Sequence, residues 1–86
     1  MAEYKITIKK SAVKELEDIL RKDLRKIIKR IRSLAGDPRP HGSQKLSGQQ
    51  QYRIRQGNYR IVYSVEDKKL LIDIVKIGHR REVYRP

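Results

Sequence analysis

The chain has 86 residues, 37% of them hydrophobic and 6% aromatic, with 22 Lys and Arg against 10 Asp and Glu. This length predicts one domain over residues 1–86, with a core small enough that a bound partner would add to its stability. Cysteine is absent, which excludes a disulfide framework and thiolate chemistry. No apolar run approaches the ~18 residues of a membrane span, and lysines interrupt the apolar residues near the N-terminus, so no signal peptide is expected. We therefore expect a cytoplasmic protein without a membrane partner.

The net charge of +12 is large for so short a chain. Such an excess favours a polyanionic partner and fast, salt-sensitive association with nucleic acid. An anionic membrane is the competing polyanion, but the chain has no Trp and no Phe for an amphipathic helix that lies in a membrane interface. The charge therefore predicts nucleic-acid binding.

The N-terminal part of the chain predicts a strand followed by a helix. Residues 4–8 alternate apolar and polar side chains, which is the period of a half-buried strand. Ser11 is a good N-cap for the helix that follows. The apolar stripe of this helix is predicted to contain Val13, Leu16 and Leu20.

A second helical pattern covers residues 24–34 and keeps the phase of the first, so periodicity leaves one long helix or two helices open. Gly36 and the proline after it end the pattern. A break near residues 21–23, with Asp23 as a new N-cap, gives a compact helical hairpin, which we favour. Residues 36–51 are rich in Gly, Pro, Ser and Gln and are predicted to be a linker.

The segment from Tyr52 to Tyr63 predicts a β-hairpin closed by a two-residue Gly57-Asn58 turn. The predicted pairs are Gln56 with Tyr59, Arg55 with Arg60, Ile54 with Ile61, and Tyr52 with Tyr63. Because side chains alternate along a strand, the apolar pairs share one face and the arginines share the other. Arginines directly opposite each other repel, and an anion between them removes that penalty. The hairpin therefore predicts a phosphate-sized site.

A third strand of this meander is predicted after a turn at residues 66–69. The predicted pairs are Val65 with Leu70, Tyr63 with Ile72, and Ile61 with Ile74, all on the core face. This register sets Ile77 beside Asn58, so that His79 and Arg80 emerge near the arginines. The chain is thus expected to be α+β: an N-terminal strand, a helical hairpin, and a three-stranded antiparallel meander in one small sheet packed on the helices.

Four pieces of the sequence resemble the RelE family of bacterial and archaeal toxins, within the RelE/ParE superfamily. They are Lys45-Leu46-Ser47-Gly48, Tyr52-Arg53-Ile54-Arg55, Gly57-Asn58-Tyr59-Arg60-Ile61-Val62-Tyr63, and Gly78-His79-Arg80 with Val83-Tyr84. The Tyr-Arg-Ile-Val-Tyr piece is shared across the superfamily, whereas the basic pair before it and the His-Arg-to-Tyr ending are closer to the RNA-cleaving branch. The resemblance implies an mRNA interferase, a ribosome-dependent endoribonuclease that enters the A site. It also implies a cognate antitoxin that wraps and neutralises the toxin.

The resemblance also implies roles for individual residues. Arg53 and Arg55 match a basic pair that lines the scissile phosphate in the family. Arg60 matches an arginine that stabilises developing phosphate charge. Arg80 matches an arginine proposed as general acid, and Tyr84 matches a tyrosine that stacks on an mRNA base. In such a reaction the RNA 2′-hydroxyl attacks in line with the leaving 5′-oxygen while cations stabilise the phosphorane. Because the histidines and carboxylates make no recognisable ligand set, neither a metal nor a small-molecule cofactor is predicted.

Arg55 departs from the family pattern, because a lysine often stands there as the proposed general base. Arginine, with a pKa above ~12, does not release its proton. Histidine is the residue type whose ordinary pKa suits proton transfer near neutrality, which makes His79 our candidate base. The alternative is a site that acts by electrostatics and geometry.

Structural interpretations stay open for several of these residues. Asp73, opposite Val62 in the predicted register, could pair with Arg60 but not with all three arginines. Glu82 could likewise pair with Arg80 in an exposed tail. Six further basic residues are predicted to contact ribosomal RNA phosphates, with a solvated helix face as the less favoured alternative. They are Lys22, Arg25, Lys26, Lys29, Arg30 and Lys45.

Two other functions compete with RNA cleavage. The first is a ParE-like toxin that poisons gyrase and cuts no RNA. The converging basic residues argue against this function. The second is a non-catalytic nucleic-acid-binding module, which would carry stacking aromatics on its basic face. The core-face positions predicted for Tyr52, Tyr59 and Tyr63 argue against that second function.

Overall fold

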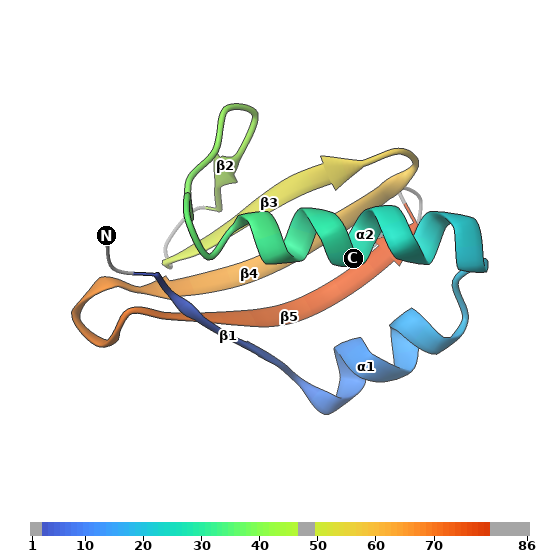
Figure 1. Ribbon diagram of the computed structural model, residues 1–86, viewed down its shortest axis with the longest axis horizontal. Helices are drawn as coiled ribbons and strands as arrows, with labels where there is room; N and C mark the ends of the chain where they lie inside the picture. The colour runs from blue at the N-terminus through green and yellow to red at the C-terminus, as the bar shows by residue number, and fades with distance from the viewer. Residues whose placement is uncertain (1–2, 47–49, 80–86) are drawn as a thin grey trace.

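The computed structural model describes residues 3–46 and 50–79. In chain order the elements are β1 (Lys5–Ile8), α1 (Lys10–Glu17), α2 (Arg21–Ser33), β2 (Gln44–Lys45), β3 (Gln51–Gln56), β4 (Tyr59–Glu66), a short 3-10 helix η1 (Asp67–Lys69), and β5 (Leu71–His79). The strands form one five-stranded sheet in the order β1-β5-β4-β3-β2, with the helices packed on it (Figure 1). The predicted α+β fold is confirmed. Neither helix is long and apolar enough to cross a membrane.

Among the described residues, the first and last strands in chain order are neighbours in the sheet. β1 runs parallel to β5, with Ile6 beside Ile72 and Ile8 beside Ile74. Past Ile8, the Lys9 N–H still donates to the carbonyl of Ile74 at 3.0 Å before the chain turns into α1. The alternation of apolar and polar residues in β1 thus half-buries Ile6 and Ile8 and leaves Lys5 and Thr7 exposed.

The β3–β4 hairpin has the predicted register throughout. All four predicted pairs are present, with Arg55 opposite Arg60 and Ile54 opposite Ile61. Gly57 adopts a φ of 61°, in the left-handed region that L side chains avoid. The two-residue turn therefore fixes the pairing of both strands.

The predicted register between β4 and β5 is wrong. Val65 lies opposite Ile72 and not Leu70, because the connection contains η1 and then Leu70 in a left-handed conformation with φ 50°. The turn still has four unpaired residues, but they are residues 67–70 and not 66–69, which moves the register by two. Ile61 in turn lies opposite Ile77, because a β-bulge shifts the register between Val62 and Tyr63. An extra residue on β5 at such a bulge reverses the alternation. Ile77 therefore faces the core and does not lie beside Asn58.

Two separate helices are present, as predicted, but their N-caps differ from the prediction. The cap residues are Lys9 for α1 and Leu20 for α2, neither of which makes a side-chain cap hydrogen bond. Ser11 and Asp23, the predicted caps, lie within the first turns of the helices, and the break falls at residues 18–20 and not at the predicted 21–23. The apolar stripe of α1 is also different, since Ala12 and Leu16 are buried whereas Val13 and Leu20 are 41% and 66% exposed.

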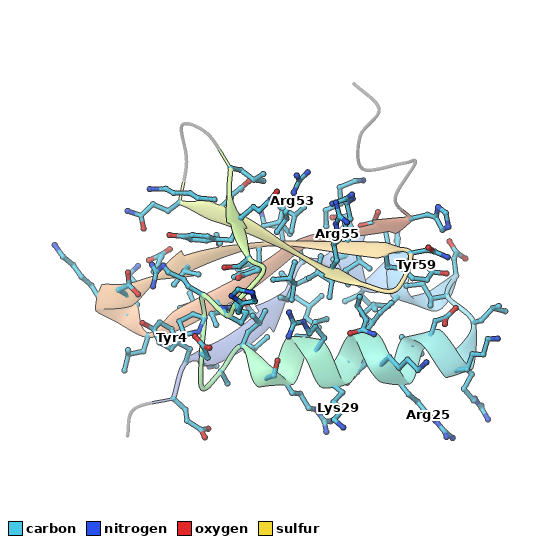
Figure 2. The ribbon with its side chains drawn as sticks, turned by 90° about the horizontal axis from the view of Figure 1, so that it is seen from above. Tyr4, Arg25, Lys29, Arg53, Arg55 and Tyr59 are labelled. Carbon is cyan, nitrogen blue, oxygen red and sulfur yellow. The ribbon has the colours of Figure 1, made fainter. Side chains whose placement is uncertain are left out.

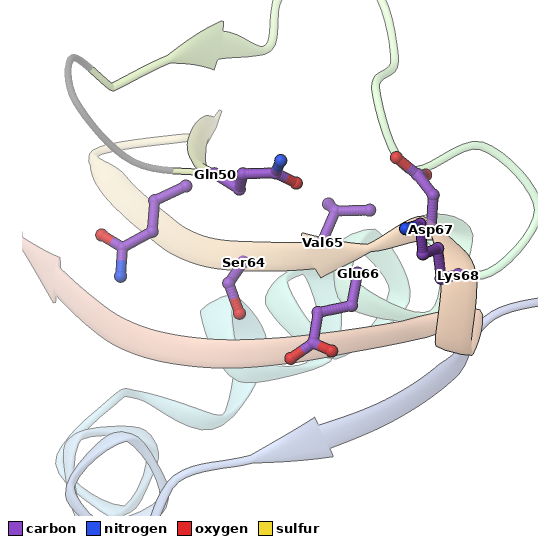
Figure 3. A pocket seen from close by; sticks show the side chains of 7 residues that line it. Gln50, Ser64, Val65, Glu66, Asp67 and Lys68 are labelled. Carbon is purple, nitrogen blue, oxygen red and sulfur yellow. The ribbon is translucent and has the colours of Figure 1, made fainter.

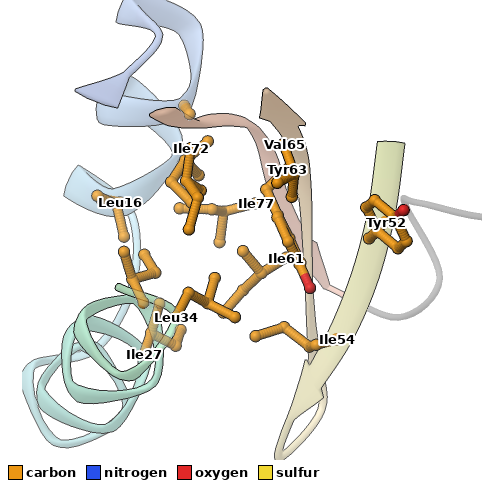
Figure 4. Packing of buried hydrophobic residues seen from close by; sticks show 13 residues of the cluster. Leu16, Ile27, Leu34, Tyr52, Ile54, Ile61, Tyr63, Val65, Ile72 and Ile77 are labelled. Carbon is orange, nitrogen blue, oxygen red and sulfur yellow. The ribbon is translucent and has the colours of Figure 1, made fainter. Parts of the chain in front are cut away.

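The hydrophobic core lies between the two helices and one face of the sheet (Figure 4). Ile27 and Ile31 of α2, with Leu34 directly after it, meet Ile54 of β3 and the isoleucines of β4 and β5 there. Full burial of one such side chain is worth about 1.5–3 kcal/mol. Tyr52 and Tyr63 belong to the core and Tyr59 packs against it, which confirms their predicted positions.

The predicted linker is more ordered than its composition suggested. It contains β2, which pairs with β3, and Arg39 before it forms a clamp on the sheet. The Arg39 guanidinium donates to the hydroxyl of Tyr52 at 2.9 Å and to both carboxylate oxygens of Asp67 at 3.1 and 2.8 Å. Tyr4 donates to the same carboxylate at 2.7 Å. These bonds from Arg39 and Tyr4 hold the pKa of Asp67 below its ordinary value.

Candidate anion-binding site

Three arginines share the face of the sheet that is turned away from the helices, and we name Arg53, Arg55 and Arg60 the arginine face. Arg53 and Arg55 point to this side from β3 (Figure 2). Arg55 and Arg60 form a directly opposed pair across the hairpin. Their Cβ atoms are therefore about 5 Å apart, and Arg53 lies one step further along the same face. The predicted convergence of these residues on one face is present.

The three arginines differ in exposure. Arg60 is only 2% exposed, whereas Arg55 is exposed beside it. Val62, the next residue of β4 on this face, is 8% exposed. A hollow of about 40 Å³ lies at the hairpin tip, lined by Arg55, Gly57, Asn58, Tyr59 and Arg60. It has room for part of a phosphate group, so a nucleotide would rest on this face and not within a deep pocket.

Asp73, the carboxylate considered as a partner for Arg60, does not reach the opposed pair. Asp73 lies opposite Ser64 and not Val62, as a result of the shifted register. Ser64 is four residues from Arg60 along β4, about 13 Å at the rise of a strand. The Asp73 carboxylate accepts a hydrogen bond from Thr7 at 3.0 Å. The salt bridge from Asp73 to Arg60 that we considered is therefore out of reach. Arg53, for its part, donates to the side-chain oxygen of Gln44 in β2, through Nε at 3.0 Å.

His79 ends β5 at the hairpin-tip end of the sheet, as predicted, but on the opposite face. It pairs with Tyr59, and Gly78 pairs with Arg60. The rings of His79 and Tyr59 meet edge to face with centroids 5.6 Å apart. Because directly paired residues share a face, His79 lies on the core side with Tyr59, across the sheet from Arg55. Arg80 and Tyr84 lie outside the described residues.

The basic residues of α2 line two neighbouring hollows, and Lys29 borders both. Lys26, Lys29 and Arg30 line a cavity together with Gln56 of β3. Arg25 instead borders a groove whose floor is Leu24 and Ile28, and Arg25 and Lys29 extend from the outer side of the helix (Figure 2). Lys22 is exposed on the same helix, and Lys45 is exposed in β2. Sequence reasoning missed Gln56, although its place after Arg55 predicts that it faces the helices.

A second residue that sequence reasoning missed is Glu15 of α1. Its carboxylate accepts the backbone N–H of Ile77 at 3.0 Å and pairs with Lys76 at 3.3 Å. These bonds tie α1 to the part of β5 that carries His79. No pattern in the sequence signals a contact between residues so far apart in the chain.

A wider hollow of about 560 Å³ lies at the other end of the sheet, between β4 and the residue before β3 (Figure 3). Glu66, Asp67 and Lys68 line it together with Gln50 and Ser64. Its two carboxylates make it a poor place for a phosphate. The candidate site for an anion is therefore the arginine face and not the larger hollow.

The chain is similar to known toxins in sequence and in fold. A family model described as ParE toxin of type II toxin-antitoxin system, parDE, matches residues 6–84. The archaeal RelE-RelB complex from Pyrococcus horikoshii OT3 is similar with 30% identity over 91% of this chain and 96% of that one, at a TM-score of 0.80. The isolated E. coli RelE toxin is 27% identical over 96% and 92%, with a TM-score of 0.77.

The RelBE2 toxin-antitoxin complex from Mycobacterium tuberculosis shares the fold, with a TM-score of 0.82 at 20% identity over 93% of this chain and 94% of that one. No curated protein matches the sequence. The matches define a toxin of a type II toxin-antitoxin system. The chain belongs to the RelE/ParE toxin superfamily, with a family model from the ParE side and structural neighbours from the RelE side.

Proposed function

We propose that this toxin is a metal-independent endoribonuclease that cleaves mRNA in the ribosomal A site and so inhibits translation. The observation that carries the proposal is the directly opposed pair of Arg55 and Arg60, with Arg53 beside it on one face. Two opposed cations repel each other unless an anion lies between them. A guanidinium donates two parallel hydrogen bonds to phosphate, which suits the scissile group of RNA.

In this reaction the RNA supplies its own nucleophile. The 2′-hydroxyl attacks the neighbouring phosphorus, and the 5′-oxygen leaves, giving a 2′,3′-cyclic phosphate and a 5′-hydroxyl. The ribosome and the arginine face hold these atoms in line, and the guanidinium groups stabilise the charge that gathers on the phosphorane. Roles for Arg80 as general acid and for Tyr84 as a stacking residue rest on the family resemblance.

The position of His79 bears on its candidacy as the general base. Arg55 keeps its proton, and His79 lies on the other face of the sheet, beside Tyr59. We therefore favour a site that acts by electrostatics and geometry, in which three cations near the reacting group lower the pKa of the 2′-hydroxyl.

The proposed partners are the ribosome, with its rRNA and mRNA, and a cognate antitoxin protein. The excess positive charge of α2 supports contact with rRNA phosphates. The solved relatives named as toxin-antitoxin complexes support an antitoxin. The groove floored by Leu24 and Ile28, which phosphate contacts do not need, supports a protein partner.

Gyrase poisoning is the alternative function, and the match to the ParE family model favours it. The deciding experiment is primer extension on mRNA in programmed ribosomes, beside a gyrase supercoiling assay. We expect cleavage by the wild type, a loss of at least 10²-fold in Arg55→Gln, and wild-type cleavage in the matched control Lys68→Gln. Arg80→Ala and Tyr84→Ala test the roles that the resemblance implies. Inhibited supercoiling without any cleavage would establish the alternative.

A further inference from the structure

A second basic cavity lies on the helix side of the β3–β4 hairpin, across the sheet from the arginine face. Its volume is about 290 Å³, and its lining consists of Lys26, Lys29, Arg30, Ser33 and Gln56. None of these five residues is acidic. Arg30 and Gln56 are half-buried, whereas both lysines are exposed at the rim. The Ser33 hydroxyl donates to the carbonyl of Arg30 at 2.6 Å, so the cations and the Gln56 amide are the donors available to an oxyanion.

The cavity and the arginine face meet at one narrow edge of the sheet. Arg55 and Gln56 are successive residues of β3, so their side chains lie on opposite faces. β2 pairs only with Tyr52 and Arg53, and among the described residues no strand lies beside the last three residues of β3. The carbonyl of Gln51 faces this edge, where it accepts the N–H of Leu46 at 2.8 Å. Because backbone groups alternate along an antiparallel strand, the N–H of Arg55 faces the same edge.

We propose that this cavity is a second phosphate-binding subsite for the RNA strand whose scissile phosphate lies on the arginine face. The strand would bend round the open edge of β3, with one phosphate between the arginines and a nearby phosphate held by Lys26 and Arg30. Contacts of this kind position a strand without reading its sequence. The proposal rests on the proposed function and names how the same site holds its substrate.

The lining favours a phosphate over a protein segment in this cavity. The neighbouring groove on α2 has an apolar floor of Leu24 and Ile28, which an amphipathic protein segment would cover. The cavity beside Gln56 has no Leu, Ile or Val in its lining. Lysine and arginine head groups that converge on one cavity are the usual means by which a protein holds the phosphates of a nucleic-acid backbone.

The test measures binding of a 2′-O-methyl RNA of about 12 nucleotides, which lacks the attacking hydroxyl, to the full chain without ribosomes. The double variant Lys26→Gln/Arg30→Gln is compared with Arg21→Gln/Arg32→Gln, which removes the same charge from the same helix outside the cavity. Loss of one phosphate contact makes the negative slope of log K against log salt shallower by about 0.7. We expect that change in the cavity variant and a smaller one in the control, with the fold of both variants checked by circular dichroism.

A scan with single methylphosphonates, each of which removes one phosphate charge, then locates the contact. We expect one position whose substitution weakens binding of the wild type but not of the cavity variant. We also expect a different, nearby position whose substitution weakens binding of the wild type but not of Arg55→Gln. Three results would each overturn the proposal. They are equal effects of the cavity and control variants, a single methylphosphonate position that accounts for both the cavity variant and Arg55→Gln, and no measurable binding by the wild type. Because this RNA cannot be cleaved, a failure of the nuclease assay leaves the result unaffected.

Discussion

Arg60 combines a positive charge with near-complete burial, being 2% exposed beside the exposed Arg55. Taking a guanidinium out of water is costly unless hydrogen bonds and opposite charge compensate for it. A sequence pattern places Arg60 on a face but does not reveal its burial, which depends on what covers that face. The opposed pair thus has one fixed and one accessible member.

The position of His79 leads to a prediction about the base. Because its ring lies with Tyr59 on the core side, we expect His79→Gln to cleave ribosome-bound mRNA within about tenfold of the wild type. A positioned general base contributes about 10²–10⁴-fold. A loss of that size in single-turnover cleavage, with binding unchanged, would return His79 to the role of base.

The Arg39 clamp predicts a dependence of stability on pH. The folded pKa of Asp67 lies below its ordinary value of 3.8, because the carboxylate accepts hydrogen bonds from Arg39 and Tyr4. The Asp67 carboxylate therefore contributes to the free energy of unfolding above its pKa in the unfolded chain. This contribution is lost as the pH falls through its pKa in the folded protein. We expect Asp67→Asn to be less stable than the wild type near neutral pH and the difference to shrink below about pH 4.

Urea unfolding midpoints of both proteins across this pH range measure the effect. Asp18→Asn, which removes an exposed carboxylate at the end of α1, is the control. A difference between wild type and Asp67→Asn that stays constant down to acid pH would show that the clamp contributes by packing and not by charge.

At the scale of elements, the two turns of the meander show what a sequence can specify. The Gly57-Asn58 turn has two residues and one preferred geometry, so every pair of the hairpin could be predicted. The connection through η1 and Leu70 is compatible with several lengths. The bulge near Val62 shows in the sequence only as a break in alternation, with Lys76 where Ile72 and Ile74 predict an apolar residue. The face of His79 was missed for this reason, since one extra residue reverses every side chain beyond it.

The helices give a similar lesson. Their separation could be predicted from compactness, but both N-caps were misplaced because neither cap uses a side-chain hydrogen bond. The exposure of Val13 and Leu20 could not be predicted either. Periodicity defines a stripe only to within about a residue on either side, and the tertiary contacts of α1 decide which residues are buried.

Gly57 provides a test of the hairpin as an element. A Cβ at Gly57 would have no atom within 4 Å, so substitution to Ala adds only the cost of its positive φ. We expect Gly57→Ala to lower the free energy of unfolding by about 1 kcal/mol. Gly36 is equally open but lacks a positive φ, so Gly36→Ala should be neutral or slightly stabilising. Equal urea midpoints for the two variants would contradict the assigned turn.

At the scale of the whole molecule, the net charge of +12 dominates the behaviour of the free toxin. Self-repulsion destabilises a compact state, and salt screens it. We expect the melting temperature of the isolated chain to rise between about 50 and about 200 mM sodium chloride. The double variant Lys10→Glu/Lys14→Glu lowers the net charge away from the proposed sites. Its melting temperature should rise less with salt. A melting temperature that falls with salt would indicate that favourable ion pairs outweigh the repulsion.

The pairing of β1 with β5 has a consequence for how the toxin is made. The two strands come from opposite ends of the described chain, so the sheet cannot close until its last strand has left the ribosomal exit tunnel. Contacts between distant parts of a chain also form slowly. If the proposed activity is correct, the nascent polypeptide stays harmless to the ribosome that is synthesising it. A cell then has the time before the sheet closes in which to capture each new copy.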